Sequence, residues 1–389
     1  MRVANNVSAT TIEQGVNNFL TGVLWGREVD GEWEWISTEP SLQKPEGCPN
    51  CTTYFKYLEN QLVKSAIDRK TLREKTGQFV HSEGERFKCF YDELVELLRY
   101  NKKPSVCRRR EDRILEEEKN LKTENDKEKE IKRPRRQSVL YADPLPVNGY
   151  RSADGTLYHY ILPAFFRLIQ YLQQTDRDYA IILRTMGDDS VNFLYNAQRV
   201  LANEHPNFTF EKLIPVSLIP GKIRRTGTLE GKDEKITLEL PKVDDNDELM
   251  EIDDEFQIND KLKQFDGIHG IKDDFNYWCN NQYLYSSSKP IWFDPEKDVD
   301  VHHILFDDNF RVIDPYDSIV DIRVMNHNTH QCKTVPFEHY SKLENVFAVQ
   351  ADLLKILENE NYFVEKIEEC ERNLDKLLNN VEILNQIRQ

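Results

Sequence analysis

Two adjacent carboxylates end the stretch Val301–Asn309, VHHILFDDN, and their type and spacing suit metal chemistry. The run of Val, Ile, Leu and Phe predicts a buried strand, with Asp307 and Asp308 at its carboxyl end. Open α/β sheets bind ligands at that end of their strands. Hard cations such as Mg²⁺ take carboxylate oxygens together with substrate phosphate, so both residues are candidate magnesium ligands. The alternative is a simple turn, since Asp and Asn hydrogen-bond their own backbone and end strands.

A second apolar run ends in a hydroxyl group. Asp178–Gly187, DYAIILRTMG, carries Thr185 near its end and leads into a helix-like segment, Asp188–Leu201. A hydroxyl at the tip of a strand, followed by a helix N-terminus, can bind phosphate oxygens. Between the two runs, Ser286–Asp294, SSSKPIWFD, offers Lys289 as a compact positive charge. The chain therefore presents a hydroxyl, an ammonium and paired carboxylates, in that order.

This order of strand-Thr, Lys and strand-Asp-Asp resembles motifs II, III and IV of the haloacid dehalogenase superfamily, over roughly residues 155–325. The resemblance implies an α/β core with a parallel, Rossmann-type sheet. It assigns phosphoryl binding to Thr185, charge neutralisation to Lys289, and Mg²⁺ to Asp307 with Asp308. It also implies a phosphate-bearing small molecule or protein as the ligand.

The family's first motif, D-x-D-x-T/V after an apolar strand, supplies a nucleophilic Asp that this chain does not show. Residues 1–10, MRVANNVSAT, contain no Asp, and Ser152–Leu157, SADGTL, has Ser at the nucleophile position and is typical of a turn. Without a nucleophile no aspartyl-phosphate can form. The sequence therefore favours a degenerate or N-terminally truncated member of a Mg²⁺-dependent phosphatase family, inactive as given. The alternative is a non-catalytic interaction or scaffold protein.

Composition limits the environment and the partners. The length of 389 residues suggests two or three domains, and a net charge of −16 argues against general nucleic-acid binding. No apolar run has transmembrane length, and no signal peptide is recognised at the N-terminus. Seven cysteines, an odd number, fit a reducing compartment better than a disulfide framework. We expect an intracellular, soluble protein in the cytoplasm, with the nucleus as the alternative because of the basic patch at 132–136.

The motif Cys48-Pro49-Asn50-Cys51 could be half of a zinc site, a redox pair or an ordinary loop. A structural zinc site needs four ligands, and no second pair follows at zinc-finger spacing. We therefore expect a loop with free thiols.

The first half of the chain divides into a helical segment and a charged linker. Residues 11–106 show apolar positions at three- and four-residue steps, first from Ile12 to Val23, and an aromatic hairpin around Trp25–Trp35. In the haloacid dehalogenase superfamily a helical insertion after the first strand acts as a cap, and this segment is placed like one. Residues 107–138 have almost no apolar content and are expected to be a mobile linker.

Alternating helix and strand patterns over 139–335 predict the α/β core. Its helix Tyr158–Leu172 requires Pro163 to lie in the first turn. Residues 226–260 are acidic and expected to form a mobile loop. Asp273–Trp278 has the mix of carboxylates and aromatics expected near a pocket, but core packing explains Trp278 equally well. Residues 338–389 show an apolar seam that predicts a helical hairpin or, by pairing with a second copy, a coiled-coil homodimer.

Overall fold

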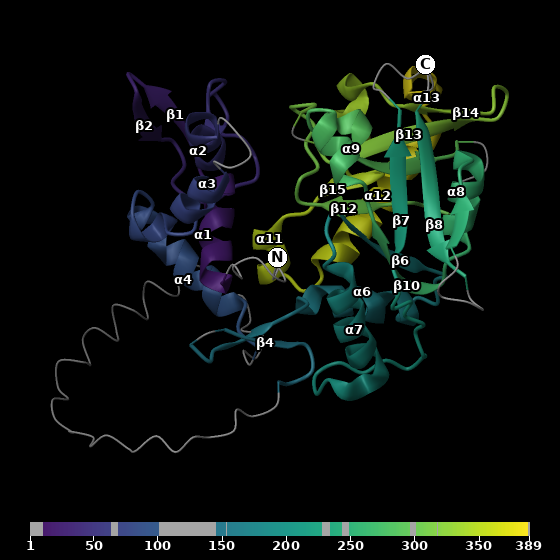
Figure 1. Ribbon diagram of the computed structural model, residues 1–389, viewed down its shortest axis with the longest axis horizontal. Helices are drawn as coiled ribbons and strands as arrows, with labels where there is room; N and C mark the ends of the chain where they lie inside the picture. The colour runs from purple at the N-terminus through teal and green to yellow at the C-terminus, as the bar shows by residue number, and fades with distance from the viewer. Residues whose placement is uncertain are drawn as a thin grey trace.

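The computed structural model describes residues 11–63, 69–100, 145–152, 154–227, 234–242, 249–295, 301–316 and 318–387. These residues form an N-terminal lobe, residues 11–100, and an α/β unit, residues 145–387 (Figure 1). The predicted linker 107–138 and the basic patch within it lie outside the described residues. In the described ranges, no helix combines the length and apolarity needed to cross a membrane.

The N-terminal lobe consists of helices around a small sheet of strand order β2-β1-β3. Its elements are α1 (Ile12–Val23), β1 (Trp25–Val29), β2 (Glu32–Trp35), β3 (Thr52–Thr53), α2 (Tyr54–Leu62), α3 (Arg69–Thr76) and α4 (Lys88–Leu97). A capping box starts α1, because the Thr11 hydroxyl accepts from the Gln14 backbone N–H at 3.2 Å and the Gln14 side chain accepts from the Thr11 N–H at 3.1 Å. The predicted first helix and aromatic hairpin are thus confirmed.

The hairpin of β4 (Gly149–Arg151) and β5 (Leu157–His159) joins the lobe to the α/β unit. Tyr100 donates its backbone N–H to Leu157 O at 3.0 Å, and His159 donates its own to Leu98 O at 3.0 Å. Tyr158, only 2% exposed, is part of the lobe's core. The hairpin's turn is the predicted one: Asp154 accepts from the Thr156 N–H at 2.9 Å.

A five-stranded sheet of order β6-β10-β7-β8-β9 forms one part of the α/β unit. Its strands are β6 (Ala180–Thr185), β7 (Gly221–Thr226), β8 (Lys235–Pro241), β9 (Leu249–Ile252) and β10 (Gly267–Lys272); its helices are α6 (Pro163–Gln174), α7 (Ser190–Arg199), α8 (Glu255–Lys263) and α9 (Phe275–Asn280). β6, β10 and β7 are parallel, whereas β8 and β9 continue antiparallel. The α/β class is confirmed and Pro163 lies in the first turn of α6, but the sheet is mixed rather than wholly parallel.

The segment 226–260 is not one acidic loop, as the sequence had suggested. It contains β8, β9 and the first part of α8. Ile236, Leu238 and Leu240 alternate along β8 and are 2%, 0% and 8% exposed. This period-2 apolar pattern builds a strand, and the neighbouring acids obscured it.

Two further sheets complete the unit. β11 (Lys289–Phe293) pairs in parallel with β13 (Val320–Asn326), which pairs antiparallel with β14 (Gln331–Thr334). β12 (Leu305–Asp307) pairs in parallel with β15 (Ala348–Gln350). The predicted strand 301–309 is therefore short, and the stretch SSSKPIWFD, expected to lie between strands, supplies the fully buried β11.

The C-terminal segment is part of the α/β unit rather than a separate extension. Its helices are α10 (Tyr340–Leu343), α11 (Leu353–Glu358), α12 (Tyr362–Leu378) and α13 (Val381–Ile387). β15 interrupts the expected hairpin and pairs with the Asp307 strand. The predicted seam of α12 packs within the chain: the Phe363 ring lies 5.2 Å from that of Phe306, and Leu374 and Leu377 pack in the apolar cluster that contains Val320 of β13.

Candidate functional site

The Lys289 ammonium lies where three strands meet. Lys289 opens β11, and its Nζ is 2.6 Å from Oδ2 of Asp307, the last residue of β12. The same Nζ is 3.4 Å from the carbonyl oxygen of Arg184, the residue before Thr185 at the end of β6. The Lys289 and Asp307 side chains are only 4% and 9% exposed. The structure thus brings Lys289, Asp307 and the Thr185 strand end together, although their strands belong to three different sheets.

Asp308, the second predicted metal ligand, has an exposed side chain. Its neighbour Asp307 also uses Oδ1 to accept the Asn309 backbone N–H at 3.0 Å. The sequence left a turn and a ligand site as alternatives for the Asp-Asp-Asn motif. Asp307 takes part in the turn and also contacts Lys289, so the two alternatives do not exclude each other. Of the two predicted ligands, Asp307 faces the buried lysine and Asp308 faces outward.

The predicted magnesium ligands are Asp307, which is paired with the buried Lys289, and Asp308, whose side chain is exposed. In the described ranges, no cluster of three or more His, Cys, Asp or Glu residues could hold a metal. Asp307 is already neutralised by Lys289. Two carboxylates suit a hydrated Mg²⁺ whose remaining ligands are water and substrate phosphate, so Mg²⁺ binding stays a prediction that depends on substrate.

Thr185 is the last residue of β6 and lies shortly before the start of α7. Its Oγ1 accepts the Gly187 backbone N–H at 3.0 Å, in the turn that leads to α7. Asp188, in the same turn, pairs with Lys272 Nζ at 2.5 Å, at the end of the neighbouring strand β10. The hydroxyl at a strand tip before a helix, expected from the sequence, is present.

A buried ion pair beside Thr185 was not predicted. Arg184 and Asp273 form a bidentate pair and are only 7% and 1% exposed. The other end of the guanidinium donates to Pro290 O at 3.1 Å, directly after Lys289. Asp273 belongs to the stretch whose carboxylates and aromatics had suggested a pocket, but nothing local in the sequence pointed to Arg184 as its partner.

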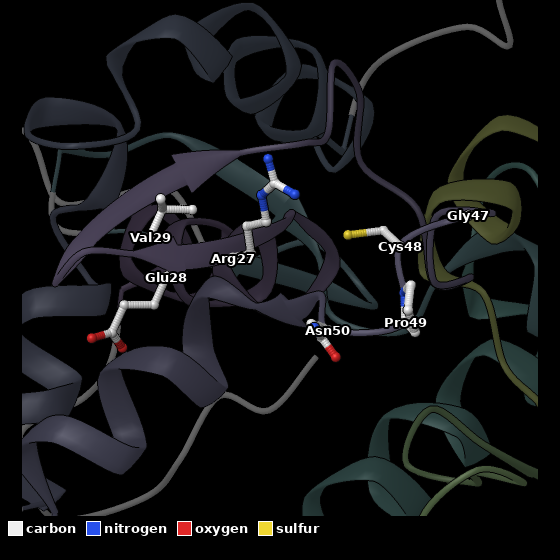
Figure 2. Close-up of a pocket in the computed structure, with 7 residues that line it drawn as sticks. All are labelled: Arg27, Glu28, Val29, Gly47, Cys48, Pro49 and Asn50. Carbon is white, nitrogen blue, oxygen red and sulfur yellow. The ribbon is translucent and has the colours of Figure 1, made fainter.

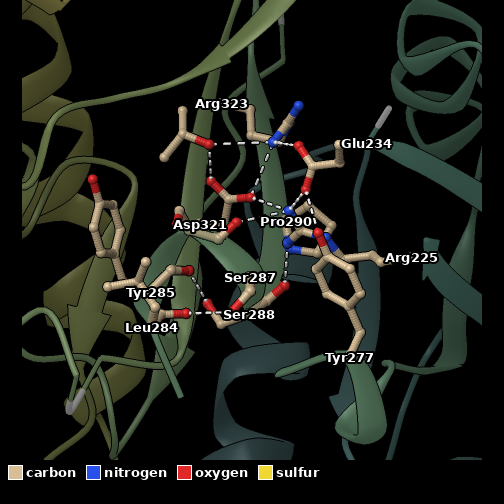
Figure 3. A network of polar contacts seen from close by, with 12 residues as sticks. Arg225, Glu234, Tyr277, Leu284, Tyr285, Ser287, Ser288, Pro290, Asp321 and Arg323 are labelled. Carbon is tan, nitrogen blue, oxygen red and sulfur yellow. Dashed lines mark hydrogen bonds and ion pairs between the residues drawn. The ribbon is translucent and has the colours of Figure 1, made fainter. Parts of the chain in front are cut away.

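A larger set of buried charges lies between the five-stranded sheet and the β11–β13–β14 sheet (Figure 3). This inter-sheet ion network consists of Arg225, Glu234, Glu255, Asp321 and Arg323. Asp321 is fully buried, with Arg225 Nη2 at 3.0 Å and Arg323 Nη1 at 3.2 Å from its Oδ2. Burial raises the pKa of Asp321, although both guanidinium groups oppose that shift.

For Glu234, the two arginines outweigh the effect of burial on the pKa. Its partial burial acts to raise its pKa, but Arg225 and Arg323 together lower the pKa below the ordinary value. The network thus keeps at least this carboxylate ionised.

In the N-terminal lobe, Cys48 and Cys51 form a disulfide, which corrects the expectation of free thiols. A hollow of about 400 Å³ lies beside the disulfide, and Figure 2 shows the residues that line it. The hollow is lined by Arg27, Glu28, Val29, Gly47, Cys48, Pro49 and Asn50. Arg27 is itself paired with Glu34 at 2.7 Å. This open hollow belongs to a different lobe from Lys289 and shares no residue with the site.

No family model, curated protein or solved structure matches the chain. Function therefore has to be inferred from the geometry of the residues themselves.

Proposed function

We propose that the α/β unit is a phosphoryl-binding core of haloacid-dehalogenase type, in a degenerate or N-terminally truncated member of a Mg²⁺-dependent phosphatase family. The observation that carries this proposal is the Lys289 ammonium, which contacts Asp307 at 2.6 Å and the carbonyl before Thr185 at 3.4 Å. The resemblance assigns charge neutralisation to Lys289, metal binding to Asp307 and phosphate binding to Thr185, which directly follows the contacted carbonyl.

The chemistry of these groups suits a phosphate-bearing small molecule or protein. Lys289 supplies a desolvated positive charge, and Thr185 supplies a hydroxyl before the N-terminus of α7. Mg²⁺, when bound to Asp307 and Asp308, would neutralise charge on the phosphate oxygens. Because Lys289 and Asp307 neutralise each other at rest, an incoming phosphate must compete for the lysine.

Two strand edges support the idea that a strand is missing from the site. Among the described residues, β6 pairs only with β10 and β12 pairs only with β15. The apolar residues of β6, Ile181, Ile182 and Leu183, are only half-buried. Open strand edges can be covered by an added strand. A strand that paired with these edges and ended in Asp would bring a carboxylate toward Lys289.

Turnover by the chain as given is expected to be absent, because Lys289 and Mg²⁺ stabilise a transition state only when a nucleophile reaches the phosphorus. The test is an assay against a phosphomonoester panel with Mg²⁺. Hydrolysis that disappears in Asp308→Asn would show that a nucleophile is present and would overturn the inactive assignment. Hydrolysis that appears only after an apolar strand ending in D-x-D is added upstream would support truncation.

Binding is tested separately from turnover, by titrating inorganic phosphate into the protein with and without Mg²⁺. We expect Lys289→Ala to weaken phosphate binding by about tenfold or more, since hydrogen bonds to charged groups contribute about 1.5–3 kcal/mol. Lys355→Ala is the matched control, because Lys355 is 70% exposed and lies on α11. Equal binding by both variants would contradict the proposal.

A non-catalytic interaction or scaffold protein is the second candidate. It is favoured by the occupied state of the site, where Asp307 is already held by Lys289 and Asp308 points outward. Absence of both turnover and phosphate binding, with and without the upstream strand, would leave this reading ahead.

A further inference from the structure

Two arginines hold the backbone on either side of Lys289. Arg225 donates from Nη1 to Ser288 O and from Nη2 to Ser286 O, both at 2.7 Å. Arg184 donates to Pro290 O at 3.1 Å. The carbonyls before and after Lys289 are therefore both bound by guanidinium groups.

Arg225 reaches this turn from another sheet. It lies on β7 of the five-stranded sheet, whereas Lys289 opens β11 of the three-stranded sheet. Figure 3 shows the Arg225 side chain between Tyr277 and Asp321, with dashed contacts to the turn. The Arg225 side chain is 1% exposed and pairs with Asp321 at 3.0 Å, and its guanidinium lies 5.1 Å from the Tyr277 ring centroid.

These contacts fix the base of a flexible side chain. A lysine has four rotatable side-chain bonds, and holding it in one geometry costs side-chain entropy. The Lys289 side chain contacts Asp307 and is buried. The position of the ammonium therefore depends on the orientation of the Lys289 backbone, which sets the direction of the Cα–Cβ bond. Two charge-assisted hydrogen bonds from Arg225 set that direction.

We propose that Arg225 is a positioning residue for Lys289: through the carbonyls of Ser286 and Ser288 it holds the ammonium at the phosphate site. The placement of Lys289 by Arg225 is a structural inference, whereas its consequence for phosphate binding rests on the proposed function. Arg323 shares the same ion network, but its hydrogen bonds go to Glu255, Glu234 and Asp321 rather than to the 286–288 turn. It therefore provides a matched control.

The test compares two double variants of equal charge change. Arg225→Met with Asp321→Asn removes the two hydrogen bonds from Arg225 to the 286–288 turn and the ion pair between Arg225 and Asp321. Arg323→Met with Asp321→Asn removes the other arginine and the same carboxylate, but leaves Arg225 on both carbonyls. Circular dichroism and thermal unfolding establish that each variant is folded before its site is measured.

The direct readout is the ¹³Cε NMR signal of Lys289 in lysine-labelled protein, assigned by its loss in Lys289→Ala. We expect the Arg225 double variant to move this signal toward those of exposed lysines and to weaken phosphate binding by about tenfold. The Arg323 double variant should leave the signal in place and keep phosphate binding within about twofold.

An unmoved Lys289 signal in the folded Arg225 double variant, or equal displacement in both double variants, would overturn the positioning role. If the Arg225 double variant does not fold, Arg225→Lys is measured in its place. A lysine keeps the positive charge beside Asp321, but its single ammonium cannot reproduce the two hydrogen bonds from the guanidinium to the carbonyls of Ser286 and Ser288. Failure of Lys289→Ala to weaken phosphate binding would overturn the proposed function, while the NMR comparison would still decide the role of Arg225.

Discussion

The N-terminal lobe and the inter-sheet ion network are both buried, but opposite chemistry holds them together. The lobe's core is apolar and aromatic, with Leu20, Phe79 and Phe87 at most 1% exposed. The network places Arg225 and Asp321, also at most 1% exposed, between two sheets. Apolar burial is non-directional and tolerates imperfect shape, whereas a buried charge depends on its particular partners. Removing one charged partner from the network should therefore lower the free energy of unfolding more than removing an apolar group of similar size from the lobe.

The largest effect is expected for Asp321→Asn. This substitution removes the charge of the fully buried carboxylate that pairs with both Arg225 and Arg323, and leaves them sharing the more exposed Glu234. Breaking a buried ion network by removing one partner typically costs about 3–5 kcal/mol, so we expect the free energy of unfolding to fall by about 4 kcal/mol. Denaturant unfolding followed by circular dichroism measures the change.

The cause of that loss is separated from simple loss of packing by adding Arg323→Met. With Arg323 and Asp321 both removed, the network again has one more carboxylate than arginine, as in the unchanged protein, and Arg225 keeps Glu234 as its partner, so part of the lost stability should return. A double variant as unstable as the sum of its single variants would contradict the ionic explanation.

The lobe gives the next-largest effect, with Leu20→Ala. Leu20 lies on α1 and is fully buried, so its truncation removes apolar contact and leaves a cavity. We expect a loss of about 3 kcal/mol by the same unfolding measurement. Leu213→Ala is the control, because Leu213 is 90% exposed and its loss should change stability by less than about 0.5 kcal/mol. Equal effects at both positions would mean that the lobe's core does not carry its stability.

The same contrast explains which parts of the fold could be predicted. The helix at 12–23 and the aromatic hairpin follow from residue spacing within one segment, which the sequence displays directly. The strands within the 226–260 segment were missed because acidic neighbours obscure the short period-2 run of β8. β15 was missed because three residues are too few to show any period within a helical pattern.

The candidate site was predictable to the extent that it lies at strand ends. Thr185, Lys289 and Asp307 could be singled out from the sequence because each is a chemically distinct group at the boundary of an apolar run. Arg184 and Arg225 were not, because their partners Asp273 and Asp321 are distant in sequence. A charged residue inside a strand resembles a solvent-facing one until the topology brings its partner opposite.

The smallest of the three effects is a loss of stability in mild acid at the junction of lobe and unit. His159 of β5 packs its ring 5.1 Å from that of Tyr100, whose hydroxyl contacts Nε2 of His205 at 3.1 Å. Burial lowers the pKa of His159 from 6.5 to about 4, the positive charge of His205 adds to the shift, and Glu360 opposes it. Burial also lowers the pKa of His205.

Because the folded-state pKa of His159 lies below the unfolded value, the unfolded chain binds its proton first as pH falls. Stability is therefore fully present above about pH 6.5, decreases as the pH falls below that value, and the loss is complete near pH 4. At pH 5 the cost from this one group is about 2 kcal/mol.

Denaturant unfolding at pH 7 and pH 5 should show a smaller difference for His159→Phe than for the unchanged protein, because phenylalanine fills the site without a proton to bind. Exposed His81 provides the control, since His81→Ala should keep the full pH dependence. An identical pH dependence in His159→Phe and the unchanged protein would assign the acid sensitivity to groups other than this junction.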